Sequence, residues 1–143
     1  MLRDGLSDGL NRTVNVAGER DLIALLGSLR PHCDGLAYVF ATADVVPATL
    51  SPIVVVREAE GITVVVERHA ADREGLEYHF VAARITLQVH SALDAVGLTA
   101  AVATALAAAG ISANVVAGHF HDHVFVPFDR RTEALAVLRG LAG

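Results

Sequence analysis

The stretch from Ile85 to Pro127 most constrains the fold, because its periodicity changes from strand to helix and back. Residues 84–89 alternate apolar and polar side chains, as a strand with one buried face does. Residues 95–109 are rich in Ala and predict a helix, and Gly110 stands where a left-handed C-terminal cap belongs. Two Val-rich segments, 111–117 and 124–126, then predict strands. This order favours an antiparallel sheet with helices on one face.

Shorter elements are predicted in the rest of the chain. The predicted helices are residues 18–30, stopped by Pro31, residues 70–75, ended by Gly75, and residues 129–141, with Asp129 as N-cap. The predicted strands are residues 13–17, 36–42, 53–57 and 62–67, with residues 77–82 leading into the second half. Residues 1–12 have the composition of a loose leader.

The chain also contains a weak internal repeat. VVVERHAADREGL (residues 64–76) resembles VFVPFDRRTEAL (residues 124–135) as strand, link and helix. Upstream, residues 21–40 resemble residues 99–116 as helix, turn and strand. The repeat predicts two halves of βαββα type. We therefore expect an α+β fold with two ferredoxin-like halves, a first domain at residues 13–76 and a second at residues 77–143.

Composition excludes several function classes. The 143 residues are 53% hydrophobic and carry a net charge of −5 without a run of basic residues. A nucleic-acid or anionic-membrane partner needs a basic surface, so neither is expected. The single Cys33 excludes an internal disulfide and a Cys-based zinc cluster. No signal segment or membrane-length apolar run is visible, and a cytoplasmic protein is expected.

The segment VHSALDAVGLTAAVATALAAAGISANVVAGHFHDHVFVP resembles the C-terminal half of an uncharacterised bacterial family of tandem ACT-like domains. Its helix-start turn with Gly97 and its Gly110-Ile111 junction match the general ACT pattern. The upstream segment PIVVVREAEGITVVVE fits the other half. The resemblance implies two ACT-like (βαββαβ-type) domains, a non-enzymatic regulatory role, dimers, and amino acids bound at a domain interface.

The turn between the first strand and the helix is the first candidate binding site. A helix start carries unpaired N–H groups that can hold a carboxylate, and an acidic side chain can hold an ammonium group. This complement suits an amino acid. Alternatively, Ser91 and Asp94 only cap the helix and Gly97 only permits close packing. The candidate ligand-binding residues are His90, Ser91, Leu93, Asp94, Ala95, Val96 and Gly97, together with Asn114.

Asn114 and a histidine-rich run complete the candidates. Asn114 is expected on a strand beside residues 84–89, within reach of the same turn, where either backbone groups or a ligand would satisfy it. The run His119-Phe120-His121-Asp122-His123 falls between two strands, with His121-Asp122 expected as the turn. Its His119, His121, Asp122 and His123 side chains are interpreted as a pocket rim or contact surface, or as solvated turn residues, and no metal site is assigned.

The sequence therefore predicts a binding protein without a cofactor or catalytic residues. The preferred hypothesis is a homodimer that senses an amino acid or a similar small molecule. A second hypothesis is a structural or interaction module without a ligand. A third is a metal protein or enzyme built on the histidine run, which has neither a Cys nearby nor an HExxH pattern.

Overall fold

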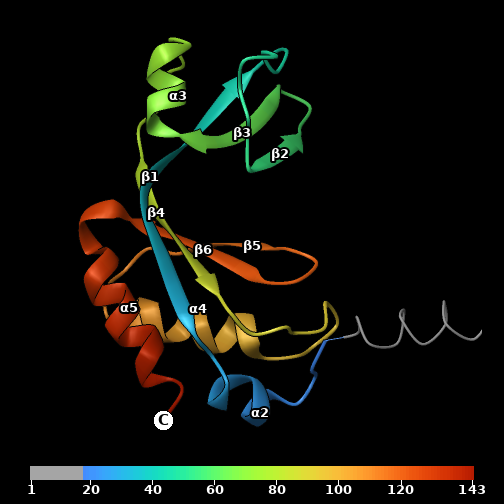
Figure 1. Cartoon of the computed structure of the whole chain (residues 1–143), viewed down its shortest axis with the longest axis vertical. Helices are drawn as coiled ribbons and strands as arrows, with labels where there is room; N and C mark the ends of the chain where they lie inside the picture. Colours follow the sequence, from blue (N-terminus) through green and yellow to red (C-terminus); the bar gives the residue numbers. More distant parts are fainter. Residues whose placement is uncertain (1–17) are drawn as a thin grey trace, which may run out of the picture.

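The computed structural model describes residues 18–143 (Figure 1). Its α-helices are α2 (Leu22–Gly27), α3 (Arg68–Arg73), α4 (Leu98–Ala108) and α5 (Arg131–Gly140), and a 3-10 turn, η1 (Phe128–Arg130), precedes α5. Its strands are β1 (Pro31–Ala43), β2 (Val54–Arg57), β3 (Ile62–Glu67), β4 (Val81–Leu87), β5 (Asn114–Ala117) and β6 (Asp122–Pro127).

All six strands form one antiparallel sheet in the order β2-β3-β1-β4-β6-β5. The order is symmetric about the central β1–β4 pair. On one side, Tyr38 pairs with Glu67 and Ala43 with Ile62; on the other, residues 82–87 pair with residues 127–122 in the same register. The edge strands also correspond to each other, since β2 pairs with β3, and β5 with β6, over four residues each. The chain is therefore a pseudo-twofold repeat of strand, connection, two strands and helix.

The central strand β1 serves both halves because it bends. Its register against β4 shifts between Cys33 and Ala37, which marks a bulge. Gly35 lies in this bulge with a φ of +79°, a backbone conformation that glycine adopts without strain. The part before the bulge pairs with the end of β4, and the part after it pairs with β3 and the start of β4.

The helices cover one face of the sheet and divide the core into two clusters. The larger cluster joins α2, α4 and α5 to β4 and β6, with Leu25, Ile85, Leu106 and Leu138 fully buried. The smaller cluster lies under α3 and is closed by Leu50, from the loop between β1 and β2. The helix α2 precedes β1 but packs with the second half of the sheet (Figure 1).

The face opposite the helices is also covered at its centre, because the sheet is curled. Tyr38 and Phe125 are buried there and meet edge to face, with ring centroids 6.2 Å apart. Phe40 meets Phe125 in the same way at 5.4 Å. Curling leaves the two edge strands, β2 and β5, on the same side of the molecule (Figure 1).

The α+β, ferredoxin-like architecture expected from the sequence is confirmed, and the strand at residues 62–67 has the expected bounds. The strand expected at 36–42 begins earlier, at Pro31, where a proline is tolerated because it is the first residue. The helix expected from Gly18 begins at Leu22, since Asp21 caps it. Asp129 lies within η1 and caps no helix. The strand expected at 13–17 lies outside the described residues.

The repeat is confirmed for β3–α3 against β6–α5, but one part of its alignment is wrong. The sequence pattern matched α2 and β1 with α4 and β5. In the sheet, β1 is the counterpart of the central β4, and β5 is an edge strand. The position of α4 is taken in the first half by the loop at residues 44–53, and α2 has no counterpart in the second half. Helix-to-strand order alone could not distinguish these arrangements.

Within residues 18–143, no helix has the length and hydropathy that crossing a membrane requires.

Candidate functional site

The site begins where residues 18–20 attach to the loop between β4 and α4. Glu19 donates its N–H to the His90 carbonyl and accepts from the Ala92 N–H, both at 2.9 Å. These bonds form an isolated parallel bridge between Glu19 and Ser91. A Cβ on Gly18 would lie 2.4 Å from the Ser91 carbonyl carbon, so this close approach requires glycine.

A cavity of about 250 Å³ lies at this junction. It brings together five residues that the sequence selected, of which four are ligand candidates and one is a rim candidate: His90, Ser91, Leu93, Asp94 and His119. Gly18, Arg20 and Ala92 complete its lining. The cavity is therefore formed by three segments that are distant in sequence: residues 18–20, the β4–α4 loop and the β5–β6 hairpin.

Arg20 and Asp94 form a two-pronged ion pair at this cavity. The Arg20 Nε lies 2.9 Å from Asp94 Oδ1, and its second nitrogen lies 3.0 Å from Oδ2. This hydrogen bonding lowers the pKa of Asp94 and raises the pKa of Arg20. The two side chains are 63% and 68% exposed, so water competes with the pair and its contribution to stability is small.

Aromatic side chains flank the same cavity. The His90 ring lies 5.8 Å from the Phe120 ring, which in turn meets His119 at 4.8 Å with perpendicular planes. Phe120 is 59% exposed although it is strongly apolar, and Leu93 is also exposed. The hairpin therefore stacks against the β4–α4 loop and leaves an apolar surface beside the cavity.

A buried carboxylate lies behind the cavity wall. Asp122 and Ser91 are both buried. Burial raises the pKa of Asp122, while the nearby His121 and the Ser91 hydroxyl act in the opposite direction. The His121 Nδ1 is buried as well and has no hydrogen-bond partner among the described residues. Buried polar groups are thus concentrated behind this wall of the cavity.

The expected helix start is wrong by three residues, and this changes the roles of several candidates. The helix α4 begins at Leu98, with Gly97 as an N-cap at a φ of +106° and no side-chain cap. Asp94 therefore pairs with Arg20 instead of capping the helix. A Cβ on Gly97 would lie 2.9 Å from Leu22, so the close neighbour at Gly97 is a side chain of α2. Ala95, Val96 and Gly97 do not line the cavity.

The expected position of Asn114 is also wrong. Its strand β5 lies at the edge of the sheet, and β6 separates it from β4. Asn114 pairs with Phe125, so it lies on the face opposite the helices and is exposed to solvent. Hydropathy alone does not specify strand order, and the side chain cannot reach the turn before α4.

The histidine run divides differently from expectation. Residues 119 and 120 form the bend, closed by a bond from the Gly118 N–H to the His121 carbonyl. Asp122 is the first residue of β6 and not part of the turn. His123 follows on that strand and points to the opposite face of the sheet, where it contacts Arg84 and Thr86. Among residues 18–143, no three His, Cys, Asp or Glu side chains are grouped to hold a metal ion.

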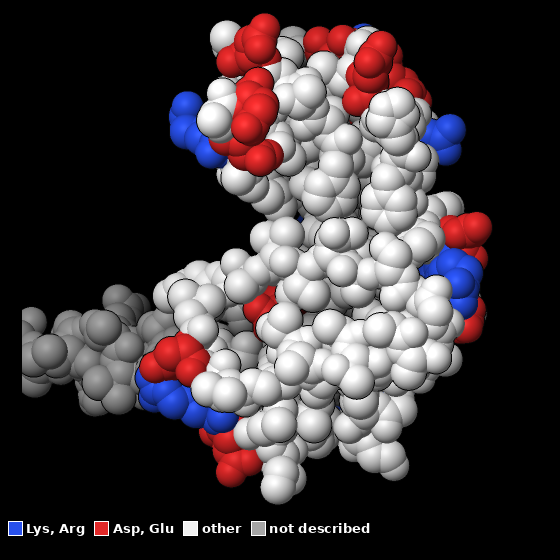
Figure 2. Space-filling model, turned by 180° about the vertical axis from the view of Figure 1, so that it is seen from behind, with Lys and Arg blue, Asp and Glu red and all other residues white. Residues whose placement is uncertain are grey.

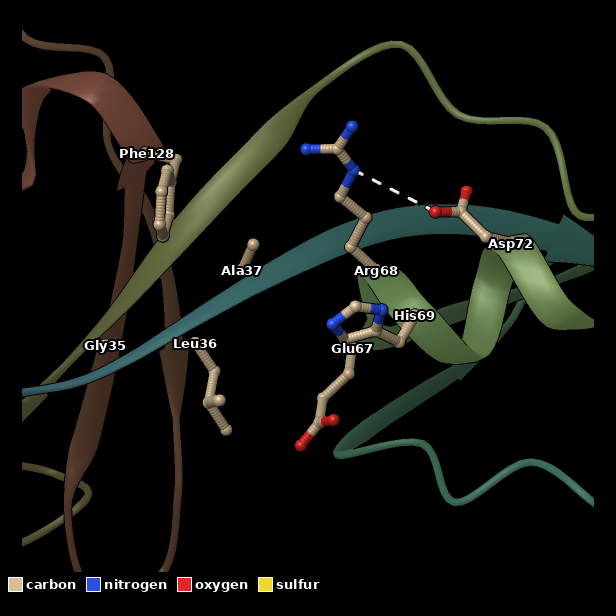
Figure 3. A pocket seen from close by; sticks show the side chains of 8 residues that line it. All are labelled: Gly35, Leu36, Ala37, Glu67, Arg68, His69, Asp72 and Phe128. Carbon is tan, nitrogen blue, oxygen red and sulfur yellow. Dashed lines mark ion pairs between the residues drawn. The ribbon is translucent and has the colours of Figure 1, made fainter.

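A larger cavity of about 450 Å³ lies between the two halves on the side of η1 (Figure 3). Residues 35–37 of β1, Phe128 and four residues around the start of α3 line it. Two of its charged side chains form an ion pair, since Arg68 Nε lies 4.0 Å from Asp72 Oδ2, and Arg68 also donates to the Tyr78 hydroxyl. None of the residues selected from the sequence lies here, and we do not assign the binding site to this cavity.

Sequence analysis did not select Gly18, Arg20 and Ala92, and of these Gly18 and Arg20 lie outside the β4–α4 loop. It placed both in a helix spanning residues 18–30. Asp21 precedes the apolar stripe directly, and its Oδ1 accepts from the N–H groups of Ile23 and Ala24. An N-cap at Asp21 was therefore the available signal that Arg20 lies outside the helix. No sequence signal indicates that this segment contacts residues 90–94.

Two family models match the chain. Each is described as an ACT domain, and together they cover residues 17–83 and residues 83–140. A protein of unknown function from Vibrio cholerae, described as a possible transport protein, is 46% identical with a TM-score of 0.78. The alignment covers 85% of this chain and 96% of that one.

More distant structures share the fold. Aspartate kinase from Clostridium acetobutylicum, described as an allosteric enzyme, is 11% identical with a TM-score of 0.62, over 80% of this chain and 34% of that one. The ligand-free regulatory subunit of aspartate kinase from Thermus thermophilus is 10% identical with a TM-score of 0.54, over 78% and 95% of the two chains. No curated protein matches the chain.

Proposed function

The chain belongs to the ACT-domain family, with two domains in tandem, and on that premise we propose that it is a regulatory protein that binds a free amino acid. A ligand-binding regulatory role is supported by the family and by the fold that the chain shares with regulatory subunits of aspartate kinase. The proposal places the ligand at the cavity lined by Arg20, His90 and Asp94.

The observation that carries the proposal is the Arg20–Asp94 pair at this cavity. An α-amino acid carries a carboxylate and an ammonium group on one carbon. A guanidinium binds a carboxylate through two parallel N–H bonds, and a carboxylate accepts from an ammonium group. The ligand can therefore replace one internal ion pair with two external pairs, which leaves every charge partnered.

Exchange of partners is favoured by the exposure of the pair. An exposed ion pair contributes little to folding, so opening it costs little. The ligand's side chain would then lie against His90 and the apolar Leu93 at the cavity. The volume of about 250 Å³ suits a molecule of amino-acid size more than a nucleotide, since drug-sized ligands occupy roughly 300–1,000 Å³.

The proposal extends to the domain boundaries, the oligomeric state and the location of the protein. We propose that its domains comprise residues 13–76 and 77–143, that the protein is a cytoplasmic homodimer, and that it regulates without catalysis. The exposed Leu93, Val96 and Phe120 side chains support self-association near the cavity. The free Cys33 is compatible with a reducing compartment.

A thermal-shift screen with each of the twenty amino acids at millimolar concentration tests the proposal. A ligand present at a hundred times its dissociation constant is expected to stabilise the protein by about 2.7 kcal/mol. The Asp94→Asn variant should lose that response because it removes the negative charge that pairs with the ammonium group. Glu60→Gln, which removes an exposed carboxylate outside the cavity, should respond as the unaltered protein does.

An absence of stabilisation by every amino acid would contradict the proposal and favour an interaction module without a ligand. An equal response in Asp94→Asn and the unaltered protein would place the ligand elsewhere. Circular dichroism of each variant establishes that the fold is intact before the responses are compared.

A further inference from the structure

The curled face of the sheet, opposite the helices, carries a polar group of its own. Arg84 and Thr86 lie on β4, and His123 faces them from β6, where it pairs with Thr86. All three side chains are partly buried. They are separate from the Arg20–Asp94 cavity, which lies beyond the end of β4. Neither the family match nor the proposed function uses them.

The hydrogen bonds of this group fix the tautomer of His123. Arg84 Nε donates to His123 Nδ1 at 3.3 Å, and Thr86 Oγ1 lies 3.0 Å from the same nitrogen. An arginine can only donate, so Nδ1 accepts and the neutral ring carries its proton on Nε2. Burial and the neighbouring positive charge of Arg84 lower the pKa of His123, which favours this neutral form.

His123 lines a further cavity, of about 220 Å³, between the two edge strands. A Cβ added to Gly118 would lie 3.4 Å from His123 Nε2, and Gly118 and His123 both line the cavity. Arg84 lines it too. The rest of its wall is mainly apolar and comes from both halves: Ile53, Val54, Val116 and Phe125. Figure 2 shows the molecule hollowed between its two lobes on the side of the edge strands.

The positive charge of Arg84, which is half-buried, has no ion-pair partner among residues 18–143. Tyr38, whose ring centroid lies 6.0 Å from the Arg84 guanidinium carbon, donates its hydroxyl proton to Asp34. Burial and that bond raise the pKa of Tyr38 to about 12, so the ring stays neutral. The cavity therefore offers a cation and N–H donors but no anion.

We propose that this cavity is a second binding site, for a small monocarboxylate with a short branched apolar chain. The carboxylate would bind Arg84 and the Nε2–H of His123, and the chain would contact Val54 and Val116. The volume limits the ligand to a few carbon atoms beyond the carboxylate, because it is smaller than the roughly 300–1,000 Å³ of drug-sized sites. Because Ile53 and Val54 belong to the first half, a bound ligand would contact both lobes.

The first half provides an internal comparison. In the matching register of the first half, Phe40 occupies the position of Arg84. Thr63 occupies the position of His123. The positions of the cation and the imidazole are thus held there by an aromatic ring and a hydroxyl. The anion site is therefore particular to the second half and is not a consequence of the fold.

Titration of ¹⁵N-labelled protein with sodium 3-methylbutanoate, followed by amide NMR, tests the proposal. The expected result is a set of saturable shifts centred on residues 116–118 and His123. The neutral 3-methylbutanamide has the same shape without the charge and should bind about tenfold more weakly or worse, since hydrogen bonds to charged groups are the stronger ones. Arg84→Met should abolish the shifts, and Arg57→Met, on β2 outside the cavity, should leave them unchanged.

Absence of saturable shifts, equal binding of the acid and the amide, or unchanged binding by Arg84→Met would each overturn the proposal. If the spectrum of Arg84→Met shows that this variant is unfolded, the binding of the acid and of the amide to the unaltered protein decides the proposal. Shifts confined to residues 90–94 would locate the acid in the other cavity and would likewise overturn this proposal. The amino-acid screen at the Arg20–Asp94 cavity is independent, so the two proposals fail separately.

Discussion

The two halves of the molecule share one backbone plan but not one set of polar groups. Each supplies a central strand, an edge hairpin and a short helix in matching register. The second half adds the helix α4, where the first has the loop at residues 44–53. It also holds a carboxylate at Asp122, where the first half has Ile62.

The two halves differ in the polarity of the side chains at matching positions of the sheet. In the first half, matching positions carry apolar or hydroxyl side chains, which only stabilise the sheet. In the second half they carry Arg84, Asp122 and His123, and each costs folding free energy unless a partner satisfies it. The second half also receives α2 and residues 18–20 from the first part of the chain. These buried or half-buried polar side chains thus lie in the half that has the larger hydrophobic core.

The largest expected effect tests whether α4 and the loop that replaces it are equivalent in stability. Replacing Leu106, a fully buried residue of α4, with Ala should cost about 3–5 kcal/mol, because a cavity remains in the larger core. Leu50→Ala, in the loop at residues 44–53, should cost about 2 kcal/mol because the loop can relax around it. Urea unfolding measures both. Equal losses would mean that the loop is as firmly integrated as the helix.

A smaller effect is expected from detaching residues 18–20. Gly18→Ala forces a Cβ against the backbone of Ser91 and should break both hydrogen bonds of Glu19, at a cost of about 1–2 kcal/mol. Amide exchange at Ala92 should rise, and the response to amino acids should weaken because Arg20 moves away. Gly27→Ala is the matched control. Its Cβ meets nothing within 4 Å, and it should stabilise α2 by about 0.5–1 kcal/mol.

The buried Asp122 carboxylate should make the stability of the protein depend on pH. Since the pKa of Asp122 is raised in the folded state, its effect on stability is most favourable below the ordinary value of 3.8 and is lost as the pH rises through the folded value. Asp122→Asn should therefore raise Tm at pH 7, and the difference should vanish in acid. Ile62→Asp, the reciprocal change, should lower Tm most at neutral pH. An Asp122→Asn difference that is constant with pH would show that the carboxylate is not the cause.

The sequence predicted the elements of the fold that depend on local signals. It did not predict the features that depend on contacts between distant residues. Strand 62–67 was predicted from its Val-rich composition and the helix end from Gly110, which has a φ of +70°; both signals are local in the sequence. The β4–α4 loop, selected from the sequence as a candidate ligand-binding turn, contributes His90, Ser91, Leu93 and Asp94 to the lining of a cavity. Strand order depends on long-range pairing, and the attachment of Arg20 to Asp94 spans 74 positions; no local pattern encodes either. Arg84 was missed because a lone arginine in an alternating strand is normally read as a solvated residue.

The smallest effect on stability should accompany the largest effect on binding. Arg20→Gln removes one member of an exposed ion pair, so Tm should not change measurably. The same variant should lose amino-acid binding, because the carboxylate of the ligand loses its two-pronged partner. Arg57→Gln, on the edge strand of the first half, should change neither quantity. Calorimetric titration with the amino acid found in the screen measures the effect. Unchanged affinity in Arg20→Gln would separate the ion pair from ligand binding, and reduced affinity in Arg57→Gln would mean that both halves bind.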